Sequence, residues 1–117
     1  MKDRRHDKRL FCADLVEVRW QQGGREQRRI ANLEDISPCG VCLLLESDLP
    51  LQTPVVVRCG VDDFDGFVRH SSGSAAGFLI GVQFAEDTRW SMDHYRPEHL
   101  LDPQELLVGE TARQTTR

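Results

Sequence analysis

The stretch Val16-Glu17-Val18-Arg19-Trp20-Gln21-Gln22-Gly23-Gly24 decides the fold. Apolar side chains at Val16, Val18 and Trp20 alternate with charged ones, which is the period of a strand with one buried and one solvated face. The two glycines that follow are typical of a tight hairpin turn, because glycine adopts positive φ without strain. We therefore expect a return strand over roughly residues 27–36.

Four further strand patterns follow along the chain. The apolar run Val41–Leu45 has no polar interruption, which is typical of a strand covered on both faces. A loop is expected at residues 49–54, and turns are expected at residues 60–63 and 71–74. Between and after them, three more apolar sets alternate with polar residues: Val55, Val57 and Cys59; Phe64, Gly66 and Val68; Ile80, Val82 and Phe84. Six strands predict an all-β fold, an antiparallel barrel, because closure removes exposed sheet edges.

The pattern changes after the last predicted strand. Residues 87–96 predict a short helix that is capped by an Asp-Thr pair, carries Trp90 and stops before Pro97. Residues 102–107 predict a second one, with Asp at the N-cap and Pro at the first helical position. We expect one or both of these C-terminal helices to plug or flank the barrel within a domain spanning residues 11–108, and residues 109–117 to form a disordered tail.

Length and composition indicate one soluble domain. The chain has 117 residues, of which 39% are apolar, too many for a disordered protein. No apolar run approaches the roughly 18 residues of a membrane span, and no apolar stretch follows the charged N-terminus. We therefore expect a cytoplasmic protein without membrane insertion.

Positive charge is concentrated in the first residues. The net charge is −4, but residues 1–9 carry five basic side chains against Asp3 and Asp7, a local +3, so the other 108 residues carry −7. A general nucleic-acid binder usually spreads its basic residues over a face of the fold. Residues 1–10 are therefore predicted to be a flexible arm suited to a compact anion. A second basic group, on the expected hairpin, fits a solvated tip or a ligand contact: Arg25, Arg28 and Arg29.

Four cysteines raise the question of a metal site or disulfides. Only Cys39 and Cys42 have the C-x-x-C spacing, and Cys42 belongs to an apolar strand pattern. A structural zinc site needs four ligands, usually in two close pairs, and no histidine pair completes one here. We expect free thiols in a reducing compartment and no bound metal.

Two short motifs carry the chemistry. Arg5 and Arg9 form an R-x-x-x-R pattern in the arm, and Asp35-Ile36-Ser37-Pro38-Cys39-Gly40 forms a D-x-S-x-x-G pattern at a strand end. Guanidinium groups match phosphate and the O6/N7 edge of guanine, and a carboxylate accepts hydrogen bonds from guanine N1–H and N2–H₂. Each motif alone also fits a solvated terminus or an ordinary turn. Together they favour a guanine-nucleotide site.

The two motifs, in this order and with a hairpin between them, make the chain resemble the PilZ family over roughly residues 4–85. The family's ligand is the bacterial second messenger cyclic di-GMP. The resemblance implies a six-stranded barrel whose arm wraps the ligand. It also implies a signalling receptor whose arm becomes ordered on binding and which passes the signal to a partner protein.

The resemblance also implies roles for the motif residues. Arg5 and Arg9 grip the phosphates and contact the guanines, and Asp35 recognises a guanine edge. Ser37 binds phosphate or base, and Gly40 lets the ligand approach the backbone. All five positions fit the family pattern.

A further guanidinium, Arg4, lies directly before the motif. Arg planes stack well on purines, so we expect Arg4 to hold a second ligand stacked on the first. In the alternative, Arg4 points to solvent and adds only a screened background charge.

Two other functions stay open. In the first alternative, the chain is a degenerate relative that binds a protein and no nucleotide. In the second, it is a small-barrel binder of single-stranded nucleic acid, which needs exposed aromatics along a basic groove. An enzyme is not expected, because the sequence has no phosphate-binding glycine loop and no nucleophile motif.

Overall fold

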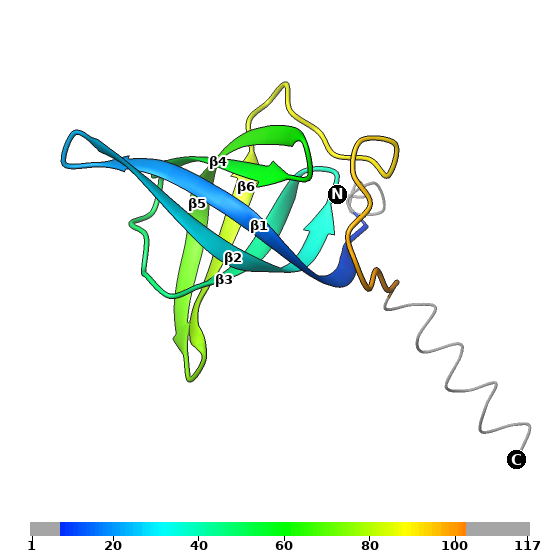
Figure 1. Ribbon diagram of the computed structural model, residues 1–117, viewed down its shortest axis with the longest axis horizontal. Coiled ribbons are helices and arrows are strands. Elements are labelled where there is room, and N and C mark those ends of the chain that lie inside the picture. The colour runs from blue at the N-terminus through cyan, green and yellow to red at the C-terminus, as the bar shows by residue number, and fades with distance from the viewer. Residues whose placement is uncertain (1–7, 103–117) are drawn as a thin grey trace, which may run out of the picture.

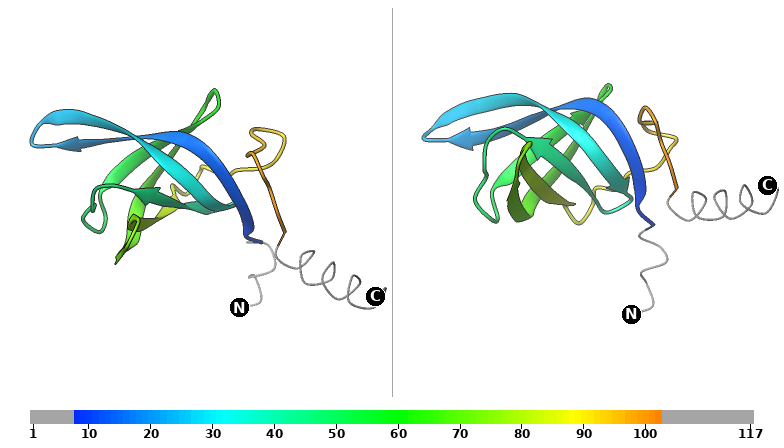
Figure 2. Two further views of the ribbon diagram at one scale, coloured as in Figure 1. Left: turned by 60° about the horizontal axis from the view of Figure 1, so that its bottom comes forward. Right: turned by 90° about the horizontal axis from the view of Figure 1, so that it is seen from below.

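Two consecutive glycines close the hairpin on which the fold is built. In the structure, a computed structural model that describes residues 8–102, Gly23 and Gly24 have φ of 61° and 79°. They join β1 (Leu10–Gln22) to β2 (Arg25–Ser37), which pair from Leu10–Ile36 to Gln22–Arg25. Both views of Figure 2 show this long hairpin extending beyond the rest of the sheet.

The sheet closes into a six-stranded antiparallel barrel. Four strands follow the hairpin: β3 (Gly40–Leu45), β4 (Pro54–Cys59), β5 (Asp62–Ser74) and β6 (Gly77–Phe84). Their order around the barrel is β1-β2-β3-β6-β5-β4, and β1 pairs with β4 to complete the ring (Figure 1). The predicted all-β barrel is confirmed.

The core lies on the inner face of this barrel. Every inward set predicted from the alternation is buried, including Val16, Val18 and Trp20 on β1. Phe64 and Phe84 stack across the interior with ring centroids 5.2 Å apart. The core therefore uses one face of each strand, and the other face lies on the outside of the barrel.

Two predictions about the strands were wrong. β3 is not covered on both faces: Val41, Leu43 and Leu45 are buried, but Cys42 is only half-buried and faces outward, because a single-layered barrel buries only its inner face. The stretch at residues 71–74 is not a turn, since β5 runs on to Ser74 and turns only at residues 75–76.

The helix expected over residues 87–96 is also absent. Residues 85–102, called here the closing segment, form only turns and an isolated bridge that joins Leu101 to Phe11. The backbone N–H of Trp90 donates to Pro38 at 3.0 Å, and its side chain is buried in the core. These contacts draw the chain onto the barrel wall, and a helix of about two turns is too short to compete.

The closing segment ends beside the start of β1 (Figure 1). Lys8, just before β1, forms an ion pair of 2.6 Å with Asp102. The second predicted helix and the predicted tail lie mostly or wholly after Asp102, outside the described residues. Most of the predicted arm, residues 1–7, also lies outside them. Within residues 8–102, no helix is long and apolar enough to cross a membrane.

Candidate functional site

A β-bulge in β2 turns the motif aspartate away from the core. Leu33 pairs with Leu43 of β3, whereas Asp35 pairs with Cys42, so that Glu34 is an extra residue in the ladder. In a regular strand Asp35 would share the inward face of Leu33, because side chains alternate. The bulge places the carboxylate on the outer face instead.

A second bulge does the same on β5. Val68 pairs with Val82 and His70 with Gly81, which leaves Arg69 as the extra residue. Val68 is buried, yet Arg69 and His70 are both exposed. Two consecutive side chains thus face the same side of the sheet, which a regular strand does not allow.

The two bulges flank a hollow on the outer face of the barrel. Because Asp35 pairs with Cys42, Cys42 with Gly81 and Gly81 with His70, these four residues form one row across β2, β3, β6 and β5. The hollow has a volume of about 530 Å³ and is called here the outer pocket. Three small residues of the central strands lie between its walls: Gly40, Cys42 and Gly81.

Arg9 forms the near wall of the outer pocket. Its guanidinium pairs with the Asp35 carboxylate, and the exposed fractions of the two side chains are 54% and 17%. Arg9 of the arm motif and Asp35 of the strand motif, 26 residues apart, therefore meet at one site. Ser37 and Gly40 line the same hollow. The other predicted ligand residues, Arg4 and Arg5, lie outside the described part of the chain.

The turn that carries Ser37 is fixed by short-range bonds. The buried Ser37 hydroxyl donates to the Gly40 carbonyl at 3.4 Å and accepts from the Cys39 N–H at 3.3 Å. The Cys39 carbonyl in turn accepts from the N–H of Phe84 at 2.7 Å. Ser37 thus organises the turn at the edge of the pocket, besides any contact with a ligand.

We expect Ser37→Ala to lower the free energy of unfolding by about 1–2 kcal/mol, because it removes a buried hydroxyl and the two hydrogen bonds that this hydroxyl makes to the turn. Urea denaturation measures the change. Ser72→Ala, at an exposed strand position, is the matched control and should be nearly neutral. Equal stability of the two variants would contradict this role of the hydroxyl.

The glycine of the motif is required by strand packing. A Cβ on Gly40 would overlap with the backbone carbonyl oxygen of Val82 on β6. The close approach of β3 and β6 therefore gives this position a structural reason to be glycine, in addition to the backbone access that the family resemblance implies.

The thiol between the walls is uncharged at neutral pH. Burial, with smaller contributions from the Asp35 and Glu34 carboxylates and an opposing one from Arg9, raises the pKa of Cys42 to about 11. Burial likewise raises the pKa values of Cys12 and Cys59 to about 12. Among residues 8–102, no group of three or more His, Cys, Asp or Glu side chains is arranged to hold a metal ion.

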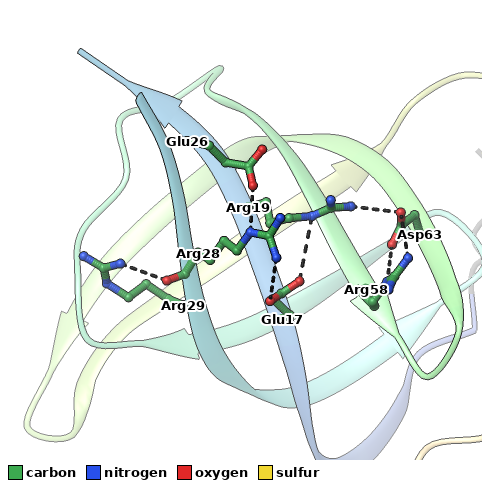
Figure 3. Close-up of polar contacts among 7 residues, drawn as sticks. All are labelled: Glu17, Arg19, Glu26, Arg28, Arg29, Arg58 and Asp63. Carbon is green, nitrogen blue, oxygen red and sulfur yellow. Dashed lines mark hydrogen bonds and ion pairs between the residues drawn. The ribbon is translucent and has the colours of Figure 1, made fainter. Parts of the chain in front are cut away.

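The second basic group lies on another part of the barrel, and one of its members, Arg28, is engaged with carboxylates. Arg28 pairs with Glu26 at 2.7 Å and with Glu17 at 3.9 Å, and the hydrogen bond that it donates to Glu26 raises the pKa of the Arg28 guanidinium. Arg29 donates to the backbone carbonyl of Arg28. The network continues across β1 to β4 and β5 through Arg19, Asp63 and Arg58 (Figure 3). This arrangement favours the solvated-surface interpretation.

Sequence reasoning missed the far wall of the pocket, which consists of Arg69, His70 and Gln83. No apolar residue follows Val68 within β5, so the change of face there leaves no trace in the hydrophobic pattern. The β2 bulge does leave one, since two polar residues, Glu34 and Asp35, separate the buried Leu33 from the buried Ile36. No protein-family model, curated protein or solved structure matches this chain.

Proposed function

We propose that the chain is a PilZ-type receptor that binds cyclic di-GMP in the outer pocket. One observation carries the proposal: Arg9 of the arm motif and Asp35 of the strand motif are paired at the edge of a hollow that Ser37 and Gly40 also line. A volume of about 530 Å³ lies within the range of pockets that enclose small-molecule ligands.

The chemistry of the near wall suits a guanine nucleotide. Asp35 can accept from guanine N1–H and N2–H₂, and Arg9 can donate to a phosphate or to the guanine O6/N7 edge. In the structure the two side chains neutralise each other. Ligand binding therefore exchanges one exposed ion pair for two charge-assisted contacts with the nucleotide, and it leaves the nucleotide chemically unchanged.

The signal passes through the arm. Lys8 is paired with Asp102 of the closing segment, and Arg9 is the next residue. A ligand that draws Arg9 over the outer pocket changes the surface formed by the arm and this segment, and a partner protein detects that change. Amide exchange of residues 1–10 with and without cyclic di-GMP tests the ordering of the arm.

We expect isothermal titration to give a dissociation constant for cyclic di-GMP in the micromolar range or below, because several charge-assisted bonds act in one pocket. GTP, which has one guanine and no cyclic linkage, is the control and should bind much more weakly. No heat and no thermal shift at about 100 μM ligand would contradict the receptor function.

The same titration measures the number of ligands. We expect two per chain, with the second held mainly by Arg4, and one per chain for Arg4→Ala. A parent ratio of one, or a ratio of two that survives Arg4→Ala, would refute the role given to Arg4.

A further inference from the structure

The far wall of the outer pocket presents groups that can recognise a nucleobase. Arg69 donates to the side-chain oxygen of Gln83 at 2.6 Å, and this bond holds its guanidinium at the pocket. The imidazole of His70 lies directly over Gly81, where a Cβ would overlap with the ring. A guanidinium and an aromatic ring therefore lie side by side on the wall opposite Arg9.

The separation between Asp35, which pairs with Arg9 at the edge of the pocket, and His70 limits what can contact both residues. Asp35 on β2 and His70 on β5 are three strand spacings apart, about 14 Å at ~4.8 Å per spacing. A single nucleobase held by Asp35 does not reach His70. A molecule with two bases joined through a backbone can contact both walls at once.

We propose that Arg69 and His70 bind the second guanine of the cyclic dinucleotide and make the receptor selective for two guanines. His70 is a stacking surface for the base, and Arg69 donates to its O6/N7 edge, the most frequent specific Arg–guanine contact. This inference rests on the proposed function and adds a second recognition site to it. Adenine presents an amino donor where guanine presents O6, so Arg69 disfavours it at this wall.

The test uses a ligand in which only one base differs. The parent and the Arg69→Ala variant are titrated with cyclic di-GMP and with the 3′,3′-linked cyclic GMP–AMP hybrid. The single guanine of the hybrid satisfies Asp35, so a preference for cyclic di-GMP beyond the statistical twofold of a symmetric ligand reports on the other wall. We expect the parent to prefer cyclic di-GMP by about tenfold, and Arg69→Ala to reduce this preference to about the twofold that ligand symmetry alone provides.

A second pair of variants tests stacking. His70→Ala should weaken both ligands by a similar factor, on the order of tenfold, because base stacking is tolerant of base identity. His70→Phe should restore most of the affinity. Arg25→Ala, which removes a guanidinium from the exposed hairpin tip, should change neither affinity nor preference. Thermal melts of all variants confirm that the exposed substitutions leave the barrel folded.

The outcomes separate this inference from the proposed function. If the parent binds cyclic di-GMP but prefers it over the hybrid by no more than about twofold, or if Arg69→Ala retains the parent's preference, the far-wall assignment is wrong and the receptor function stands. If the parent binds neither ligand, the proposed function fails and this inference fails with it.

Discussion

Arg9→Ala should weaken cyclic di-GMP binding by about tenfold to a hundredfold, because one charge-assisted contact of about 1.5–3 kcal/mol is lost. The barrel should keep its stability, since the pair that Arg9 forms with Asp35 is solvent-exposed on the Arg9 side and such pairs contribute at most about 1 kcal/mol. Isothermal titration and a thermal melt measure the two quantities. Asp35→Ala should act similarly by removing guanine recognition.

The matched control for Arg9→Ala is Arg25→Ala. Both remove one exposed guanidinium, but Arg25 lies at the hairpin tip and does not line the outer pocket. A loss of affinity in both variants would indicate a general charge effect. An Arg9→Ala variant that binds cyclic di-GMP as tightly as the parent would contradict the proposed site.

Gly40→Ala should destabilise the barrel by about 1–3 kcal/mol, because the new methyl group collides with the Val82 carbonyl oxygen of the neighbouring strand. For a domain of this size each kcal/mol lowers the melting temperature by about 4–8 °C. Scanning calorimetry measures the shift. Parent-like stability with lost affinity would show instead that Gly40 serves only the approach of the ligand.

Gly73→Ala provides the control for this effect. Gly73 also lies in a strand and has ordinary backbone angles, but an added Cβ would have only the Phe78 side chain near it, at 3.7 Å. We expect this variant to melt at or slightly above the temperature of the parent.

The barrel was predictable from the sequence because its signals are local. Alternation along β1, the paired glycines and the inward sets on β4 to β6 each depend on residues within one or two strands. The proximity of Arg9 and Asp35 at the near wall was expected from the two motifs and the family resemblance. The helix at residues 87–96 was mispredicted because local capping preference was outweighed by a tertiary contact, the bond from Trp90 to Pro38.

The far wall could not be predicted because its position depends on register. The pairing of His70 with Gly81 on β6 decides the face of the sheet on which the His70 side chain lies. The hydrophobic periodicity of one strand does not reveal how that strand pairs with its neighbour. The involvement of Arg69 and Gln83 follows from the same register shift. Bulges of this kind leave a sequence signal only when apolar residues flank them on both sides, as Leu33 and Ile36 do in β2.

The placement of the outer pocket separates selection for ligand preference from selection for stability of the barrel. Because the bulge in β5 turns His70 away from the core, the far-wall residues proposed to select a ligand are distinct from the apolar residues of the core. We therefore expect substitutions at Arg69, His70 or Gln83 to change ligand preference with little change in the free energy of unfolding. On the proposed function, the far wall is the part of the barrel at which preference for another dinucleotide can be engineered.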